Sequence, residues 1–166
     1  MEEISGIFKK VEAAMKAKPW FKKDKWQISY HPFPDRNPDA VTLHVFKKNW
    51  FNEDTRGIHI ESFLYVDPKK RKKSSVHVHL LHEDQIPGTK LKRMALSKPI
   101  VDAIYKEVSS WPGYKFRAGK YGLQPFTKEL DGKNPKFAAE LTTELERLCK
   151  YLGPEIDAVL EKFAVQ

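Results

Sequence analysis

Four segments of alternating apolar and polar residues constrain the fold of this chain more than any other feature. They cover residues 26–31, 41–46, 57–66 and 75–81, and the last one reads SVHVHLL. Successive side chains of a β-strand point to opposite faces, so a strand with one buried face alternates in this way. The segments between them, PFPDRNPD, KKNWFNEDTRG and DPKKRKKS, contain turn-forming residues. The pattern predicts antiparallel strands that share one apolar face.

Helical periodicity precedes these four segments and follows them. Residues 3–17 place apolar side chains three and four positions apart, and Pro19 follows the expected helix end. Ser97 is a typical N-cap residue, and Pro99 would fit the first turn of the helix after it. We therefore expect one helix before the sheet and another after it, the second ending near Pro112.

The rest of the chain is expected to be mostly helical. Residues 114–122 are either a fifth strand or a loop, and Gly153-Pro154 is expected to divide the C-terminal apolar stripe into two helices. This order of elements predicts an α+β fold with a mainly antiparallel sheet of about four to five strands, packed against an N-terminal helix and C-terminal helices. A chain of 166 residues suits one domain, residues 1–166.

Five of the six histidines fall on the same side of the predicted sheet. Strand parity separates the apolar face from an opposite face that holds His31, His44, His59, Glu61, His77 and His79. If core residues pair with core residues, Glu61 lies opposite His79, or opposite His77 or Leu81 after one allowed shift of the register. In the neighbouring strand pair, His44 is expected opposite His59.

This histidine face has three interpretations. It is a solvated or partly covered sheet face, or it transfers protons through a Glu–His pair near neutral pH. In the third interpretation it binds a divalent metal ion, because neutral imidazoles and a carboxylate suit Zn, Fe, Mn or Ni. The candidate ligands are His44, His59, Glu61, His77 and His79. A bound ion that activates water would make the protein a metal-dependent enzyme, most simply a hydrolase.

Basic residues are concentrated in the first 130 residues. The net charge is +8, with 25 Lys and Arg against 15 Asp and Glu in residues 1–130, and 5 against 7 in residues 131–166. A basic surface attracts anionic partners, of which nucleic acid is expected first and an acidic protein second. The expected anion-binding residues are Lys69, Lys70, Arg71, Lys72, Lys73, Lys115 and Arg117.

These basic residues predict a non-catalytic binding module, to which the metal-dependent enzyme is the alternative. The run PKKRKK, residues 68–73, has a second interpretation as a charged hairpin tip that opposes pairing between sheet edges, and a third as a nuclear import signal. Common catalytic templates are missing from the sequence, including the GxxxxGK[ST] phosphate loop, HExxH, GxSxG and GxGxxG.

Cysteine content and hydropathy indicate the cellular compartment. Cys149 is the only cysteine, which rules out an internal disulfide and a multi-cysteine zinc site. It falls in an apolar helical stripe, so we expect a core residue rather than a nucleophile. No run of 18 apolar residues occurs, so no membrane span is expected, and a cytoplasmic location is predicted.

Overall fold

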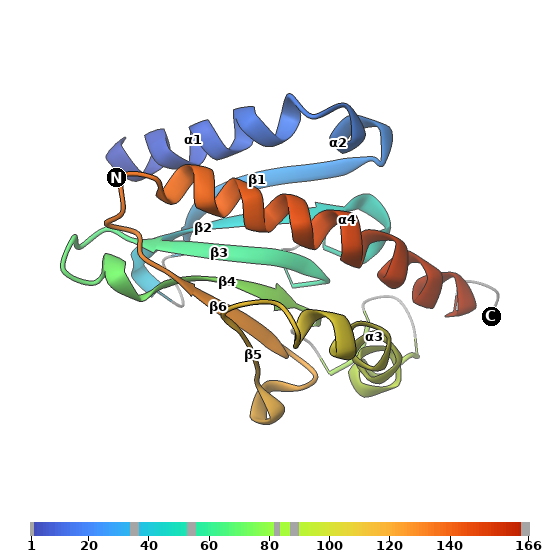
Figure 1. Cartoon of the computed structure of the whole chain (residues 1–166). Helices are drawn as coiled ribbons and strands as arrows, with labels where there is room; N and C mark the ends of the chain where they lie inside the picture. The colour runs from blue at the N-terminus through green and yellow to red at the C-terminus, as the bar shows by residue number, and fades with distance from the viewer. Residues whose placement is uncertain (1, 34–36, 53–55, 82–83, 87–89, 164–166) are drawn as a thin grey trace.

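The computed structural model of the protein describes residues 2–33, 37–52, 56–81, 84–86 and 90–163. Along the chain, its main elements are α1 (Glu2–Lys16), α2 (Pro19–Lys23), β1 (Trp26–Phe33), β2 (Asn37–Lys47), β3 (His59–Tyr65), β4 (Ser74–His79), α3 (Arg93–Val108), β5 (Tyr114–Phe116), β6 (Phe126–Leu130) and α4 (Phe137–Phe163). Figure 1 shows them as one sheet with helices packed against it. The predicted α+β class is confirmed.

The sheet has six strands among the described residues, in the order β1-β2-β3-β4-β6-β5, and every neighbouring pair is antiparallel. Its first four strands follow one another in the chain, as their alternation predicts. The expected number of four to five strands was too small, because β6 escaped notice. Its five residues, FTKEL, bury only Phe126 and Leu130 at the two ends, so they lack the strict alternation of the other strands.

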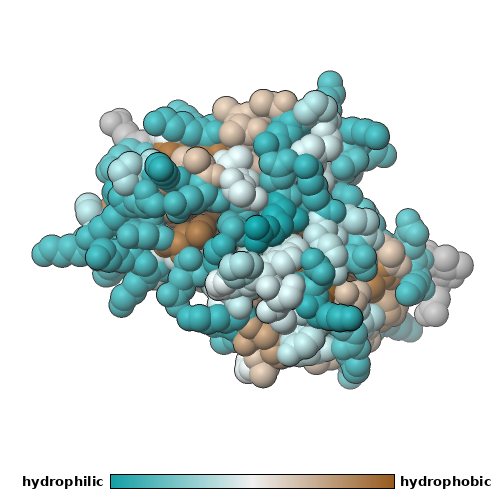
Figure 2. All heavy atoms as spheres, in the orientation of Figure 1, coloured by the Kyte–Doolittle hydropathy of each residue, from teal (hydrophilic) through white to brown (hydrophobic). Residues whose placement is uncertain are grey.

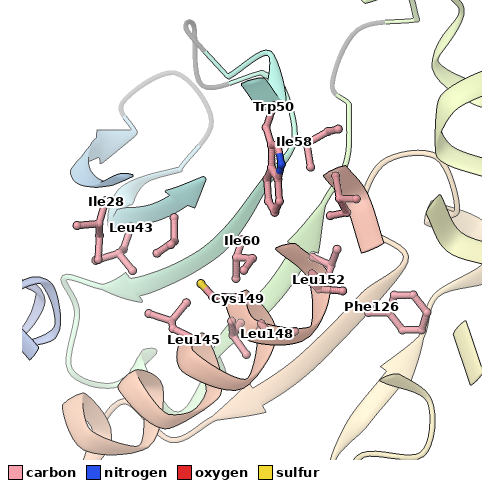
Figure 3. Packing of buried hydrophobic residues seen from close by; sticks show 14 of the residues in the cluster. Ile28, Leu43, Trp50, Ile58, Ile60, Phe126, Leu145, Leu148, Cys149 and Leu152 are labelled. Atoms are coloured by element: carbon pink, nitrogen blue, oxygen red, sulfur yellow. The ribbon is translucent and has the colours of Figure 1, made fainter. Parts of the chain in front are cut away.

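One face of the sheet is covered by α1 and α4, which cross it side by side (Figure 1). The apolar side chains of the strands meet the apolar stripe of α4 there. Figure 3 shows Ile60 of β3 among Leu145, Leu148 and Leu152 of that helix, and all four side chains are fully buried. This is the apolar face that the alternation predicted, and its removal from water is the main stabilising contribution to the fold.

The expected break at Gly153-Pro154 is wrong, because α4 is one continuous helix from Phe137 to Phe163. Proline removes one backbone donor and disfavours the preceding helical turn. The apolar stripe nevertheless continues past it, and Ile156 and Val159 are buried against the core. Gly153 allows close packing at this point, since a Cβ there would lie 2.9 Å from Cζ2 of Trp26. Tertiary packing therefore outweighs the local cost of the proline.

The predicted start of α3 at Ser97 is also wrong. The helix begins at Arg93, so Ser97 and Pro99 lie inside it. The Ser97 hydroxyl donates a hydrogen bond to the carbonyl oxygen of Gly122 at 3.2 Å, and it therefore joins α3 to the β5–β6 connection. The expected end is confirmed, since α3 finishes at Val108, before Pro112.

The thiol of Cys149 lies in the core, as the sequence predicts. Cys149 is buried in α4 as a free cysteine, and burial raises its pKa well above the ordinary value. A thiol in this environment stays protonated and is a poor nucleophile. None of the helices within the described ranges combines the length and the apolar character needed to cross a membrane.

Candidate metal centre

A row of histidine rings crosses four strands on the second face of the sheet. His31 of β1, His44 of β2, His59 of β3 and His79 of β4 follow one another, with ring centroids 5.1, 4.1 and 4.2 Å apart in that order. The rings of His59 and His79 are nearly parallel, at 9°. Strand parity predicted this shared face. His82, the remaining histidine, lies outside the described residues.

The strand registers differ from the first expectation by two residues. Glu61 of β3 lies opposite His77 of β4 rather than opposite His79, which is one of the two allowed shifts named above. On the other side, Glu61 lies opposite His44 of β2, where His59 had been expected. A shift of two keeps every side chain on its face, so parity alone could not choose between these registers.

Four histidines of this face are buried, whereas His31 and Glu61 are part-exposed, so the face is covered in part rather than fully solvated. His44 is 0% exposed and His59 is 1% exposed, and both His77 and His79 are buried as well. Burial disfavours the charged imidazolium, and it lowers the pKa of His59 well below the ordinary value and that of His77 to about 4. The rings of His59 and His77 are therefore neutral at physiological pH, which is the form that binds a metal ion.

Three of the predicted ligands converge on one point. Nε2 of His44 and Nε2 of His59 lie 3.3 and 3.5 Å from the same oxygen, Oε2 of Glu61. The three ligand atoms are all within 4.8 Å of one another. Ligands about 2.0–2.1 Å from a tetrahedral zinc ion are separated by about 3.3 Å, so these contacts match the edges of such a tetrahedron.

The hydrogen bonds of His59 determine which of its two ring nitrogens carries the proton. Nδ1 lies 3.0 Å from the carbonyl oxygen of Gly57, which only accepts, and 2.9 Å from Oδ1 of Asn52. The backbone N–H of Gly57 also donates to Oδ1 of Asn52 at 3.1 Å, which establishes the orientation of that amide. Nδ1 of His59 must therefore carry the proton. Nε2 keeps its lone pair, and it has no hydrogen-bond partner among the described residues.

Glu61 is held as a carboxylate by its neighbours. Burial acts to raise its pKa, but the contact with Nε2 of His44 outweighs this effect, and the pKa of Glu61 lies well below the ordinary value. Its second oxygen, Oε1, accepts a hydrogen bond from Nε2 of Gln124 at 3.3 Å. Hydrogen bonds of this kind orient metal ligands in known sites, so Asn52 and Gln124 are suited to the role of outer supporting groups.

The other two predicted ligands lie beside the converging group. Nδ1 of His79 donates to the carbonyl oxygen of Leu80 at 3.3 Å, and its ring stacks on His59. Nε2 of His77 lies 2.7 Å from Oγ of Ser75. Within the described part of the chain, only His44, His59 and Glu61 form a group with the spacing of metal ligands.

The basic tip, residues 69–73 in the connection between β3 and β4, contains both structural and exposed cationic side chains. Arg71 is buried, and its Nη1 and Nη2 donate to the two carboxylate oxygens of Glu3 at 2.8 and 3.0 Å. Lys70 forms an ion pair with Asp39 at 2.7 Å. The other lysines of the tip are exposed, and none of them forms an ion pair with a described residue: Lys69, Lys72 and Lys73.

The two other predicted basic residues belong to the β5 region and have different partners. Lys115 forms an ion pair with Glu129 of β6 at 3.3 Å. Arg117 instead donates from Nη1 to Oε1 of Gln124 at 3.2 Å, the amide that also contacts Glu61. Arg117 is thus the one predicted anion-binding residue that the described contacts connect to the histidine face.

Sequence reasoning missed the supporting groups Asn52, Gly57 and Gln124. None of them belongs to a β-strand of the sheet, so the parity argument did not reach them. The proximity of an Asn and a Gly to His59 in the chain was the available signal, because loop amides commonly bond to nearby side chains.

Comparisons with known proteins provide no functional assignment. No family model, curated protein or solved structure matches this chain. The function is therefore argued from the residues and their geometry.

Proposed function

We propose that this protein is a metal-dependent hydrolase whose ion is bound by His44, His59 and Glu61. The observation that carries the proposal is the contact between His59 and Glu61. Nε2 of His59 presents a lone pair, and 3.5 Å away Oε2 of Glu61 presents another. Both groups are largely removed from water, since the side chains are 1% and 17% exposed.

Two acceptors that face each other in this way repel unless a positive charge lies between them. A proton on Nε2 of His59 would provide that charge. Burial, however, lowers the pKa of His59 well below the ordinary value, so the imidazole stays neutral near pH 7. A divalent cation provides the charge without protonating the ring. The neutral imidazole of His59 and the ionised carboxylate of Glu61 are then in the states that such an ion requires.

Three protein ligands are typical of catalytic rather than structural zinc sites. They leave a fourth position for water, whose pKa zinc lowers to about 7. The side chain of Glu61 is 17% exposed, so the site is not fully closed to solvent. Two histidines and one carboxylate also suit Fe(II), and Mn and Ni accept the same donor atoms. We name zinc first because the observed spacings match its tetrahedral geometry.

Metal uptake by purified protein tests this proposal. Equilibrium dialysis against Zn²⁺, and separately against Mn²⁺ and Fe²⁺, should give about one tightly bound ion per chain. Glu61→Gln should lose that ion. Glu129→Gln, the same change at an exposed side chain of β6, should keep it. The metal-bound protein should hydrolyse activated esters, and the stripped protein should not. Equal metal uptake by wild type and Glu61→Gln would overturn the assignment.

A second candidate function is the non-catalytic binding of an anionic partner in the cytoplasm, with nucleic acid first and an acidic protein second. The exposed lysines Lys69, Lys72 and Lys73 favour it. In Figure 2, hydrophilic side chains project from the end of the molecule where Figure 1 places the β3–β4 connection. Binding to a short oligonucleotide should weaken as salt rises and should weaken further in a triple Lys→Gln variant. Salt-independent binding would contradict this candidate.

A further inference from the structure

A chain of side-chain hydrogen bonds connects Arg117 to the candidate metal centre. Nη1 of Arg117 donates to Oε1 of Gln124 at 3.2 Å, and Nε2 of Gln124 donates to Oε1 of Glu61 at 3.3 Å. The backbone supports this arrangement, because the N–H of Arg117 donates to the carbonyl oxygen of Pro125 at 2.7 Å. The N–H of Leu80, just after β4, donates to the carbonyl oxygen of Leu123 at 2.8 Å. The segment that carries Arg117 is therefore joined to the sheet.

The charge of Arg117 is not balanced by a carboxylate in the described part of the chain. Arg71 and Lys115, by contrast, are paired with Glu3 and Glu129. The Arg117 guanidinium has five N–H donors, and the hydrogen bond to Gln124 uses one of them. A planar guanidinium with unused donors is the side chain best suited to bind an oxyanion through two hydrogen bonds.

His77 supplies a second polar atom beside the same centre. It lies opposite Glu61 on the neighbouring strand, and it is close enough to Arg117 for that charge to act on its imidazole. Nε2 of His77 contacts Ser75, whereas Nδ1 is buried and has no hydrogen-bond partner among the described residues. A buried polar atom of this kind is costly unless a ligand or water satisfies it.

We propose that Arg117 binds the phosphoryl group of the substrate beside the metal ion, so that the enzyme acts on phosphate esters. This inference rests on the proposed hydrolase function. A tetrahedral phosphoryl group has enough oxygens to contact both an ion and a guanidinium, whereas a carboxylate has only two. In the reaction, the oxygen of the activated water forms a bond to phosphorus and the ester P–O bond breaks. The leaving oxygen takes up the proton that the water releases. Arg117 stabilises the charge on the phosphoryl oxygens.

Isothermal titration of the zinc-bound protein with inorganic phosphate tests this role. Arg117→Gln should weaken phosphate binding by about 10- to 100-fold, the effect of losing a charged hydrogen bond. Arg117→Lys keeps the charge but not the paired donors, so it should recover part of the affinity. Lys16→Gln is the control, because this exposed cation lies on α1, which covers the opposite face of the sheet, and is paired with Glu12. It should bind phosphate like the wild type, and acetate should bind more weakly than phosphate.

Zinc stoichiometry, measured on the same samples, separates the two proposals. If all variants bind one zinc ion and Arg117→Gln binds phosphate as tightly as the wild type, the phosphoryl assignment is wrong and the metal centre stands. Acetate binding that equals phosphate binding would also overturn the phosphoryl assignment. If the wild type takes up no zinc, the hydrolase proposal fails and this inference fails with it.

Discussion

Nδ1 of His59 lies 2.9 Å from Oδ1 of Asn52, and this contact determines which nitrogen of the ring is available to a metal ion. Because the amide oxygen and the carbonyl of Gly57 both accept, the proton is on Nδ1 and the lone pair of Nε2 points toward Glu61.

Replacement of Asn52 should weaken metal binding without removing a ligand. Asn52→Ala takes away the amide that orients His59, and loss of such a group lowers metal affinity by about 10- to 100-fold in known sites. Asn52→Asp keeps an acceptor for Nδ1 and should recover most of the affinity. Competition with a zinc chelator measures the change. Equal zinc affinity in Asn52→Ala and the wild type would show that the ring needs no such support.

Gly57→Ala should disturb the loop that holds His59. A Cβ at this position would overlap the carbonyl oxygen of Phe51 and approach the backbone nitrogen of Asn52 to 2.7 Å, so the backbone must move. We expect a loss of about 1–3 kcal/mol in the free energy of unfolding, together with weaker zinc binding. Gly119→Ala is the control, because a Cβ there meets no atom within 4 Å. Urea unfolding should show little change for the control.

The metal-free protein should lose stability as the pH falls from 7 to 4. Burial lowers the pKa of His77 from 6.5 to about 4, so the unfolded chain binds a proton that the folded chain excludes. The contribution of His77 is fully present above pH 6.5 and is lost as the pH falls toward 4. It amounts to about 3 kcal/mol over that range. The pKa values of His59 and His79 are lowered as well, and they act in the same direction.

Urea unfolding at several pH values measures this dependence. His77→Gln should show a shallower loss of stability on acidification than the wild type, because one of the buried titrating groups is gone. A free energy of unfolding that stays constant between pH 7 and 5 in the metal-free protein would contradict the buried neutral state of these histidines.

Substitutions in the basic tip should affect stability differently at the buried Arg71 and at the exposed lysines. Arg71 donates to the backbone carbonyl oxygens of Tyr65 and Val66 as well as to Glu3, so Arg71→Gln leaves part-buried carbonyl acceptors unsatisfied. We expect it to lower the free energy of unfolding by about 1–3 kcal/mol, whereas Lys72→Gln should change it by less than about 0.5 kcal/mol. Thermal unfolding of the two variants compares them directly. Equal stability would mean that Arg71 does not join the tip to α1.

The fold could be predicted from the sequence where one local pattern determined an element. Alternation with a period of two was sufficient for the first four strands and for their apolar face. It failed for β6, whose polar middle residues resemble a loop, and the proline rule failed for α4. At Pro154, the stabilisation from apolar packing against the core exceeds the local cost of a proline inside a helix. The local sequence shows the cost but not the packing.

The candidate site was predictable only in part, for the same physical reason. Parity placed His44, His59 and Glu61 on one face, because the direction of a strand side chain depends on sequence position alone. Their convergence depends on register, which a shift of two residues alters without changing any face. Asn52 and Gln124 lie outside the strands, so the alternation contained no signal for their contacts.

The most direct test of the central claim is anomalous X-ray diffraction from crystals of the zinc-bound protein, with data collected on both sides of the zinc absorption edge. The proposed metal centre predicts one strong peak among Nε2 of His44, Nε2 of His59 and Oε2 of Glu61, about 2.0–2.2 Å from each of the three atoms. A peak elsewhere, or none at this position in crystals that hold zinc at other sites, would contradict it.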